Sequence, residues 1–135
     1  MQDDYSLGKI CLVIAVLGGI FFYSKMTPQE IELPRDPEFI RRVTNAKPVI
    51  VKFGADWCPP CRYVEAELDK LATTYGDRVR VVKVDVDARP DLAQHYRVRG
   101  IPHIILFEYG KQTSEFKGAK NAEDIARWAG LNTKP

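Results

Sequence analysis

A short apolar strand pattern followed closely by a long helix pattern is the feature that most constrains the fold. Residues 49–53 form a mostly apolar run rich in β-branched side chains, typical of a buried central strand. Residues 58–75 carry apolar side chains at helical spacing and are followed by Gly76, a residue type that often ends helices. A buried strand next to an amphipathic helix indicates an α/β fold.

The rest of the chain continues this alternation. Asp36 and Pro37 predict the N-cap and first turn of a short helix that reaches about Ala46. The other predicted elements are a strand over 79–86, a helix over 91–96, strands over 104–109 and 112–116 joined by a turn at Gly110-Lys111, and an amphipathic helix over 121–130 with Ile125, Trp128 and Ala129 facing inward.

Length and charge restrict the organisation of the chain. With 135 residues, 45% of them hydrophobic, it is long enough for one compact domain but not for two. We assign this domain to residues 38–132 and expect a monomer. Residues 26–37 contain three prolines and predict a linker. The net charge of +2, without a basic stripe, gives no reason to expect nucleic-acid binding.

An uncharged apolar run covers residues 10–23. As a helix it would measure roughly 21 Å, shorter than the ~30 Å hydrocarbon core of a bilayer. Lys9 and Lys25 bracket the run and could reach the two interfaces, so we assign residues 1–25 to a membrane anchor or a signal segment. A core helix is the third interpretation, disfavoured because the run has no polar face.

The cysteines indicate redox chemistry. Cys58 and Cys61 form a C-x-x-C motif, while Cys11 lies alone in the apolar run. At the start of a helix, Cys58 is favoured as the thiolate nucleophile, and Cys61, one turn later, resolves the mixed disulfide. Pro60 is tolerated in a first helical turn, and Pro59 adds stiffness.

The motif has two other interpretations, a structural zinc site and a purely structural disulfide. A structural zinc site would need further ligands, but the chain has no second C-x-x-C, and His95 and His103 are not spaced as ligands. A purely structural disulfide between Cys58 and Cys61 would restrain little of the unfolded chain.

Two segments resemble one family. Residues 49–61 resemble the active-site strand and motif of the thioredoxins, and residues 99–103 resemble their cis-proline loop, with Phe107, Gly110 and Gly118 at matching positions. The resemblance covers residues 38–132. It implies a thioredoxin fold, with a central mixed sheet of about four to five strands flanked by helices, here preceded by the apolar N-terminal helix.

The resemblance also implies how the site works. It implies that the only redox group is the disulfide Cys58–Cys61, with no separate cofactor or metal, and that Pro102 is cis and packs beside the two sulfurs. The backbone of Ile101 would pair with the substrate chain, and an apolar docking surface would comprise Trp57, Ile101, Pro102 and Gly118. For Trp57 a plain core position is the alternative.

Two departures from the family concern the redox potential. Pro59-Pro60 stands where thioredoxins commonly have Gly-Pro. Lys52 stands where they carry a buried acid. Burial could keep Lys52 neutral; if it stays charged near the sulfurs, it makes the pair more oxidising; or its ammonium extends to solvent and does nothing.

Lys83 matches the lysine that partners the family's acid, so two cations are expected close together. The carboxylate of Asp56 or Asp85 would compensate their charge. Two further positions depart from the family. Gly54 replaces a tryptophan and opens space. His103 replaces a threonine after the cis-proline, either as a polar residue at the end of a strand or as a group that tunes the cysteines.

We expect a membrane-tethered oxidoreductase that reduces disulfides of exported proteins with electrons from an upstream donor. A tether suits a domain outside the cytoplasm, on the periplasmic side, although the positive charges after the apolar run favour the cytoplasm, and an exported soluble form is a further alternative. The rival functions are a disulfide oxidase or isomerase, and a redox-inactive module that binds copper through Cys58, Cys61 and His103.

Overall fold

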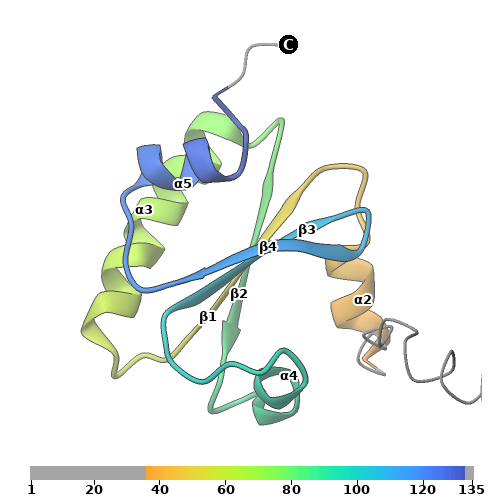
Figure 1. Cartoon of the computed structure of the whole chain (residues 1–135), viewed down its shortest axis with the longest axis vertical. Helices are drawn as coiled ribbons and strands as arrows, with labels where there is room; N and C mark the ends of the chain where they lie inside the picture. The colour runs from red at the N-terminus through yellow and green to blue at the C-terminus, as the bar shows by residue number, and fades with distance from the viewer. Residues whose placement is uncertain (1–35, 133–135) are drawn as a thin grey trace, which may run out of the picture. The chain divides into compact units, whose positions relative to one another are not determined.

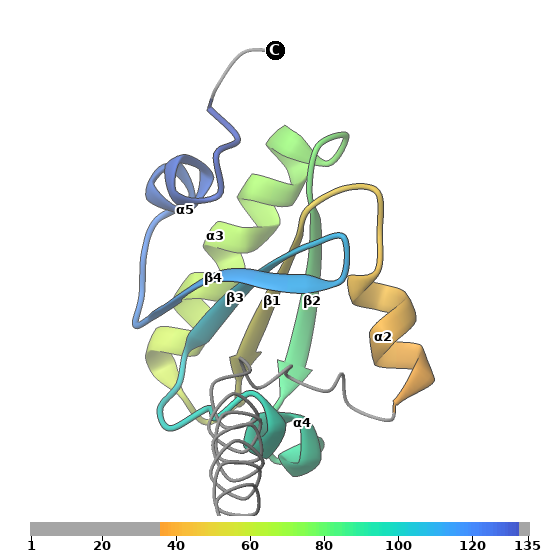
Figure 2. The same ribbon diagram turned by 45° about the vertical axis from the view of Figure 1, so that its right-hand side comes forward.

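The computed structural model describes residues 36–132 (Figures 1 and 2). The predictions for the apolar run, for Cys11 and for the linker up to residue 35 lie outside the described residues. Within the described part, no helix is both long and apolar enough to cross a membrane.

One mixed sheet of four strands forms the centre of this part of the chain. The strands are β1 (Val49–Gly54), β2 (Arg80–Asp85), β3 (His103–Glu108) and β4 (Lys111–Lys117), arranged in the order β2-β1-β3-β4. β2 runs parallel to β1, whereas β1 and β3, and β3 and β4, are antiparallel. The predicted sheet of four to five strands is therefore present with four.

Helices cover both faces of the sheet. α3 (Pro59–Tyr75) and α5 (Ala122–Trp128) lie on one face, and α2 (Pro37–Val43) and α4 (Pro90–His95) lie on the other (Figure 1). Alternate side chains of β1 and β3 therefore enter two separate cores. The core under α2 and α4 contains Phe39, Val43, Val51, Phe53, Leu92, Tyr96, Ile105 and Phe107. The core under α3 and α5 contains Ile50, Val64, Leu68, Leu71, Ile104, Leu106, Ile125 and Ala126.

α2 begins as predicted and ends early. The Asp36 side chain accepts hydrogen bonds from the backbone N–H groups of Glu38 and Phe39 at 2.9 and 3.1 Å, so it is the N-cap. The helix ends at Val43 rather than near Ala46. The Asn45 side chain accepts a hydrogen bond from the backbone N–H of Lys47 at 3.1 Å, a local turn that competes with the helix.

The C-terminal elements also differ slightly from the prediction. α5 is shorter than 121–130, because Asn121 is its N-cap and Gly130 adopts a φ of 69°. Ile125 is buried as predicted, and Trp128 is half-buried against Phe116, with ring centroids 4.7 Å apart. The turn before β4 is formed by Tyr109-Gly110, both with positive φ, rather than by Gly110-Lys111.

Candidate functional site

The two cysteines of the motif form a disulfide at the start of α3. Cys58 is the N-cap of this 17-residue helix, and its Sγ accepts a hydrogen bond from the backbone N–H of Cys61 at 3.3 Å. This places Cys58 at the positive end of the helix dipole, as predicted. Cys61 is fully buried, and Cys58 is only 4% exposed, so both residues are covered in the disulfide form.

The two prolines between the cysteines occupy the first two positions of α3, and both are exposed. A backbone N–H at either position would have no hydrogen-bond partner within the helix, so both prolines fit without breaking a helical hydrogen bond. The first turn carries no acidic side chain. The partial positive charge of the helix end therefore acts on Cys58 without a carboxylate of that turn to offset it.

The proline loop lies at the same end of the sheet as the disulfide. His103 pairs with Phe53 across β3 and β1, so Pro102 lies beside the end of the strand that leads to Cys58. The Ile101–Pro102 peptide bond is cis, as the resemblance implied. The backbone N–H of Gly118 donates to the Pro102 carbonyl oxygen at 2.9 Å, which brings the residue after β4 to the same place.

Trp57 is a surface residue with a fixed polar contact. Its side chain is 67% exposed, which excludes a plain core position, and its indole N–H donates to Asp87 Oδ2 at 2.7 Å. Asp87 was not predicted as a site residue. Since β1 and β2 are parallel neighbours, the residues that follow their carboxyl ends share one edge of the sheet, and this pairing could have suggested the contact.

Lys52 is buried behind the disulfide. It is 3% exposed, faces α3, and its Nζ lies 2.5 Å from Oε1 of Glu65, whose side chain is 33% exposed. The interpretation that its ammonium extends to solvent is therefore wrong. Neither of the predicted acids is its partner. Glu65 was not predicted as a site residue. It lies one helical turn after Cys61, and a polar residue at this position of α3 could have suggested the contact.

The second predicted cation has its own carboxylate. Lys83 lies opposite Lys52 in the register of β1 and β2, but its Nζ is 3.0 Å from Asp69 Oδ1 and its side chain is 42% exposed. The two lysines are thus paired separately. An open pocket of about 200 Å³ borders both, lined by Lys52, Gly54, Ala55, Asp56, Glu65, Lys83, Val84 and Asp85.

His103 lies on the other face of the sheet. It is 1% exposed, its ring centroid is 6.5 Å from that of Phe53, and its Nε2 is 3.2 Å from Glu115 Oε2. Phe53 belongs to the core under α2 and α4, whereas Cys61 belongs to α3 on the opposite face. The structure therefore does not bring His103 to the sulfurs. In the described part of the chain, no three His, Cys, Asp or Glu side chains are grouped to hold a metal ion.

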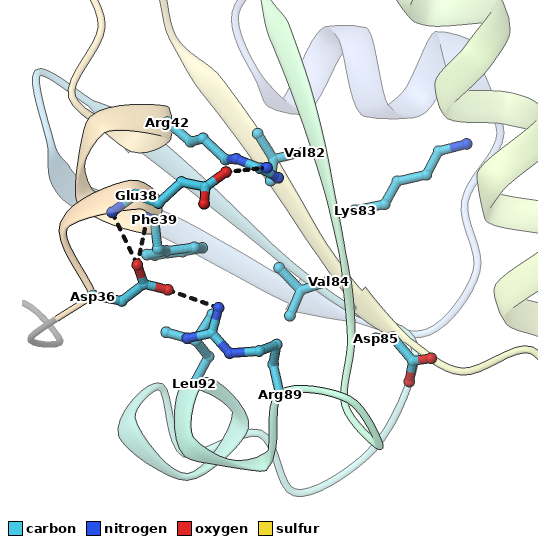
Figure 3. Close-up of a pocket in the computed structure, with 10 residues that line it drawn as sticks. All are labelled: Asp36, Glu38, Phe39, Arg42, Val82, Lys83, Val84, Asp85, Arg89 and Leu92. Carbon is cyan, nitrogen blue, oxygen red and sulfur yellow. Dashed lines mark hydrogen bonds and ion pairs between the residues drawn. The ribbon is translucent and has the colours of Figure 1, made fainter.

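A second hollow, of about 150 Å³, lies between α2, β2 and α4 (Figure 3). Two of its lining residues form an ion pair, with Arg89 Nη1 2.6 Å from Asp36 Oδ2. The backbone N–H of Phe39 and then the Arg89 guanidinium lower the pKa of Asp36, and hydrogen bonds to Asp91 and Asp36 raise the pKa of Arg89. In Figure 3 the Lys83 side chain points away from this pair. The charged residues in this hollow therefore have a structural role, because their ion pair joins the start of α2 to the start of α4.

Comparisons with known proteins agree with this geometry. The family model described as Thioredoxin matches residues 30–130. "Thioredoxin X, chloroplastic" of Arabidopsis thaliana is 44% identical over 68 residues, which are 50% of this chain and 37% of that protein. "Thioredoxin 1" of Synechococcus elongatus is 43% identical over 85 residues, which are 62% of this chain and 79% of that protein.

A solved structure is similar as well. It comes from a study titled "Structural basis of the thiol resolving mechanism in yeast mitochondrial 1-Cys peroxiredoxin via glutathione/thioredoxin systems". The match has a TM-score of 0.64 and 30% sequence identity, and it covers 73% of this chain and 92% of that one. The described residues therefore have a thioredoxin fold.

Proposed function

Because the chain belongs to the thioredoxin family and is a thiol–disulfide oxidoreductase with a Cys58–Cys61 pair, we propose that it reduces disulfides of exported proteins, with Cys58 as nucleophile and Cys61 as resolving cysteine. The observation that carries these roles is the position of the sulfurs. Cys58 caps α3, where free N–H groups favour a thiolate, and Cys61 is buried one turn later.

The reaction divides into two exchanges. In the reduced protein the Cys58 thiolate attacks one sulfur of the substrate disulfide, forms a mixed disulfide and releases the other substrate sulfur as a thiolate that takes up a proton. The Cys61 sulfur, after losing its proton, then attacks Cys58 Sγ. The Cys58–Cys61 bond forms, the second substrate sulfur leaves, and two electrons have passed to the substrate.

The substrate contacts follow from the surface around the sulfurs. The exposed indole of Trp57 and the half-buried Ile101, with Pro102 and Gly118, form the docking surface in this proposal. The Ile101 backbone pairs with an extended substrate segment in a short β-like contact. An upstream reductase returns the pair to the dithiol, as suggested by a relative from Mycobacterium leprae named "Bifunctional thioredoxin reductase/thioredoxin".

The first test uses cysteine variants of the full chain with insulin disulfides as the substrate. We expect Cys58→Ser to abolish reduction and Cys61→Ser to accumulate a mixed disulfide that mass spectrometry detects, because the resolving sulfur is gone. Cys11→Ser is the matched control and is expected to keep the activity. Insulin reduction that survives Cys58→Ser would refute the assignment.

A second candidate is a disulfide oxidase or isomerase. The observation that favours it is the buried Lys52 behind Cys61, since a positive charge there stabilises thiolate and makes the pair more oxidising. Pro59, Pro60 and Lys83 are the other residues proposed to tune the potential. A measured potential of about −270 mV supports a reductase, whereas about −120 mV supports an oxidase.

The location is part of the proposal. The support is the uncharged run over residues 10–23, which we propose anchors the domain to a membrane on its outer, periplasmic side. Labelling intact cells with a membrane-impermeant thiol reagent tests this, because only a domain outside the cytoplasm exposes reduced Cys58 to it. Labelling that requires broken cells would contradict the periplasmic placement.

A further inference from the structure

An ion pair between the buried Lys52 and the half-buried Glu65 lies behind the resolving cysteine. Lys52 is 3% exposed and its Nζ is 2.5 Å from Glu65 Oε1. A buried ammonium costs a large amount of free energy unless a carboxylate pairs with it. Glu65 therefore pairs with the Lys52 ammonium and holds it in place.

The Lys52 ammonium is close to the sulfur of Cys61. A Cβ atom added at Gly54 would lie 2.6 Å from Lys52 Nζ and 3.2 Å from Cys61 Sγ, so both atoms border the space that this glycine leaves open. They can be no farther apart than those two distances taken together. That separation falls within the roughly 4–6 Å over which a charge changes the ionisation of its neighbour.

The nearby charged groups do not take over this role. Lys83, the register partner of Lys52, is 42% exposed and is held by Asp69 at 3.0 Å. Asp56 and Asp85 line the same pocket, but both are exposed residues whose carboxylates water screens. Glu65 is the carboxylate that contacts the ammonium.

We propose that Glu65 is a positioning residue for disulfide exchange, because its carboxylate holds the Lys52 ammonium beside Cys61 and so favours the thiolate of the resolving sulfur. This inference rests on the proposed function, in which Cys61 resolves the mixed disulfide. It adds the residue that makes this buried sulfur reactive.

In this step the Cys61 thiol gives up its proton to water, and the Lys52 ammonium stabilises the sulfur anion that is left. The anion attacks Cys58 Sγ, the Cys58–Cys61 bond forms, and the bond from Cys58 to the substrate breaks. The substrate sulfur leaves with the electron pair and takes a proton from water.

The test measures the ionisation of Cys61 directly. In the full chain carrying Cys11→Ser and Cys58→Ser, Cys61 is the remaining thiol, since the sequence has three cysteines. Its thiolate is followed by ultraviolet absorbance as the pH is raised. Lys52→Met is expected to move the midpoint upward by about one pH unit, which means roughly tenfold less thiolate at a given pH below it.

Glu65 variants separate positioning from a plain structural role. Glu65→Gln is expected to move the midpoint in the same direction as Lys52→Met, because the ammonium loses the carboxylate that holds it beside Cys61. Glu65→Asp keeps the charge and is expected to give a smaller shift. Lys70→Met, which removes the exposed lysine that pairs with the buried Glu67 carboxylate on the same helix, is the matched control and should leave the midpoint unchanged.

An unchanged midpoint in Lys52→Met, or an unchanged or lower one in Glu65→Gln, overturns the inference. Circular dichroism checks that each variant is folded. If Glu65→Gln unfolds, Glu65→Asp decides, and a midpoint at or below that of the parent overturns the inference. Failure of the proposed function looks different: the natural chain would not reduce insulin, whatever the titration of Cys61 shows.

Discussion

At the scale of single residues, the site depends on polar contacts that hold otherwise free side chains. Trp57 illustrates this, since two-thirds of its surface is exposed and one hydrogen bond, to Asp87, fixes the indole. Asp87 belongs to the turn after β2, where its own backbone N–H donates to Asp85 Oδ1 at 2.9 Å. Trp57, one residue of the proposed docking surface, is thus held by the ends of two neighbouring strands.

Removing this contact should weaken substrate binding. We expect Asp87→Ala to raise the KM for a protein disulfide several-fold with little change in kcat, because the freed indole must be ordered again on binding. Steady-state insulin reduction measures both constants. Asp77→Ala, which removes an exposed acid after α3, is the control, and an equal rise in KM for it would argue against the docking role of Asp87.

At the scale of elements, one buried carboxylate joins two helices. Glu67 on α3 is 8% exposed, and its Oε2 accepts a hydrogen bond from the backbone N–H of Ala122, at the start of α5, at 2.9 Å. Its Oε1 is 2.6 Å from Lys70 Nζ. The hydrogen bond from Lys70 and then that from Ala122 lower the pKa of Glu67 below its ordinary value.

This shift predicts a pH-dependent contribution to stability. The folded protein favours the Glu67 carboxylate, so the contribution is complete above the ordinary glutamate pKa of 4.5 and is lost as the pH falls through the lower folded value. Glu67→Gln should therefore unfold at lower urea concentration near pH 7, and the difference from the natural chain should shrink in strong acid.

The control for this comparison is Glu123→Gln, which removes an exposed ion pair of α5 and should change the urea midpoint little at either pH. A deficit in Glu67→Gln that is the same at both pH values would mean that the charge of Glu67 does not stabilise the fold.

At the scale of the whole molecule, the active site and the hydrophobic core share α3. The helix that Cys58 caps also contributes Leu68, which is fully buried in the core under α3 and α5. We expect Leu68→Ala to lower the free energy of unfolding by about 2–5 kcal/mol, the usual cost of a cavity in a packed core. Urea denaturation measures this loss.

The matched control is Tyr63→Ala on the same helix, where the side chain is 50% exposed. It should cost much less, because no buried cavity forms. A similar loss in both variants would indicate that helix propensity, rather than packing, determines the stability of this helix.

The features that could be predicted are those with local signals. Asp36 as a cap and Pro59 and Pro60 in a first turn each depend on a few adjacent residues, and the cis Pro102 was implied by the family resemblance of residues 99–103. The contacts that were missed, such as that between Trp57 and Asp87, join different elements. Their partners are set by how helices and strands pack, which no short segment specifies.

His103 shows the same limit on a larger scale. Its place after Pro102 left two interpretations open, a polar residue at the end of a strand or a group that tunes the cysteines. Strand alternation directs its side chain to the face of the sheet opposite α3. The face of a strand residue follows only once the register is known. A one-residue shift of β3 would have reversed the answer.

The composition of β4 affects where an extended chain can attach. It is an outer strand of the described sheet, and its exposed positions include Lys111, Glu115 and Lys117. Charges on an outer strand discourage edge-to-edge pairing with other chains. Extended segments of other chains are thus less able to pair with this flank of the sheet, which leaves the Ile101 loop as the place where the proposed function has a substrate chain pair.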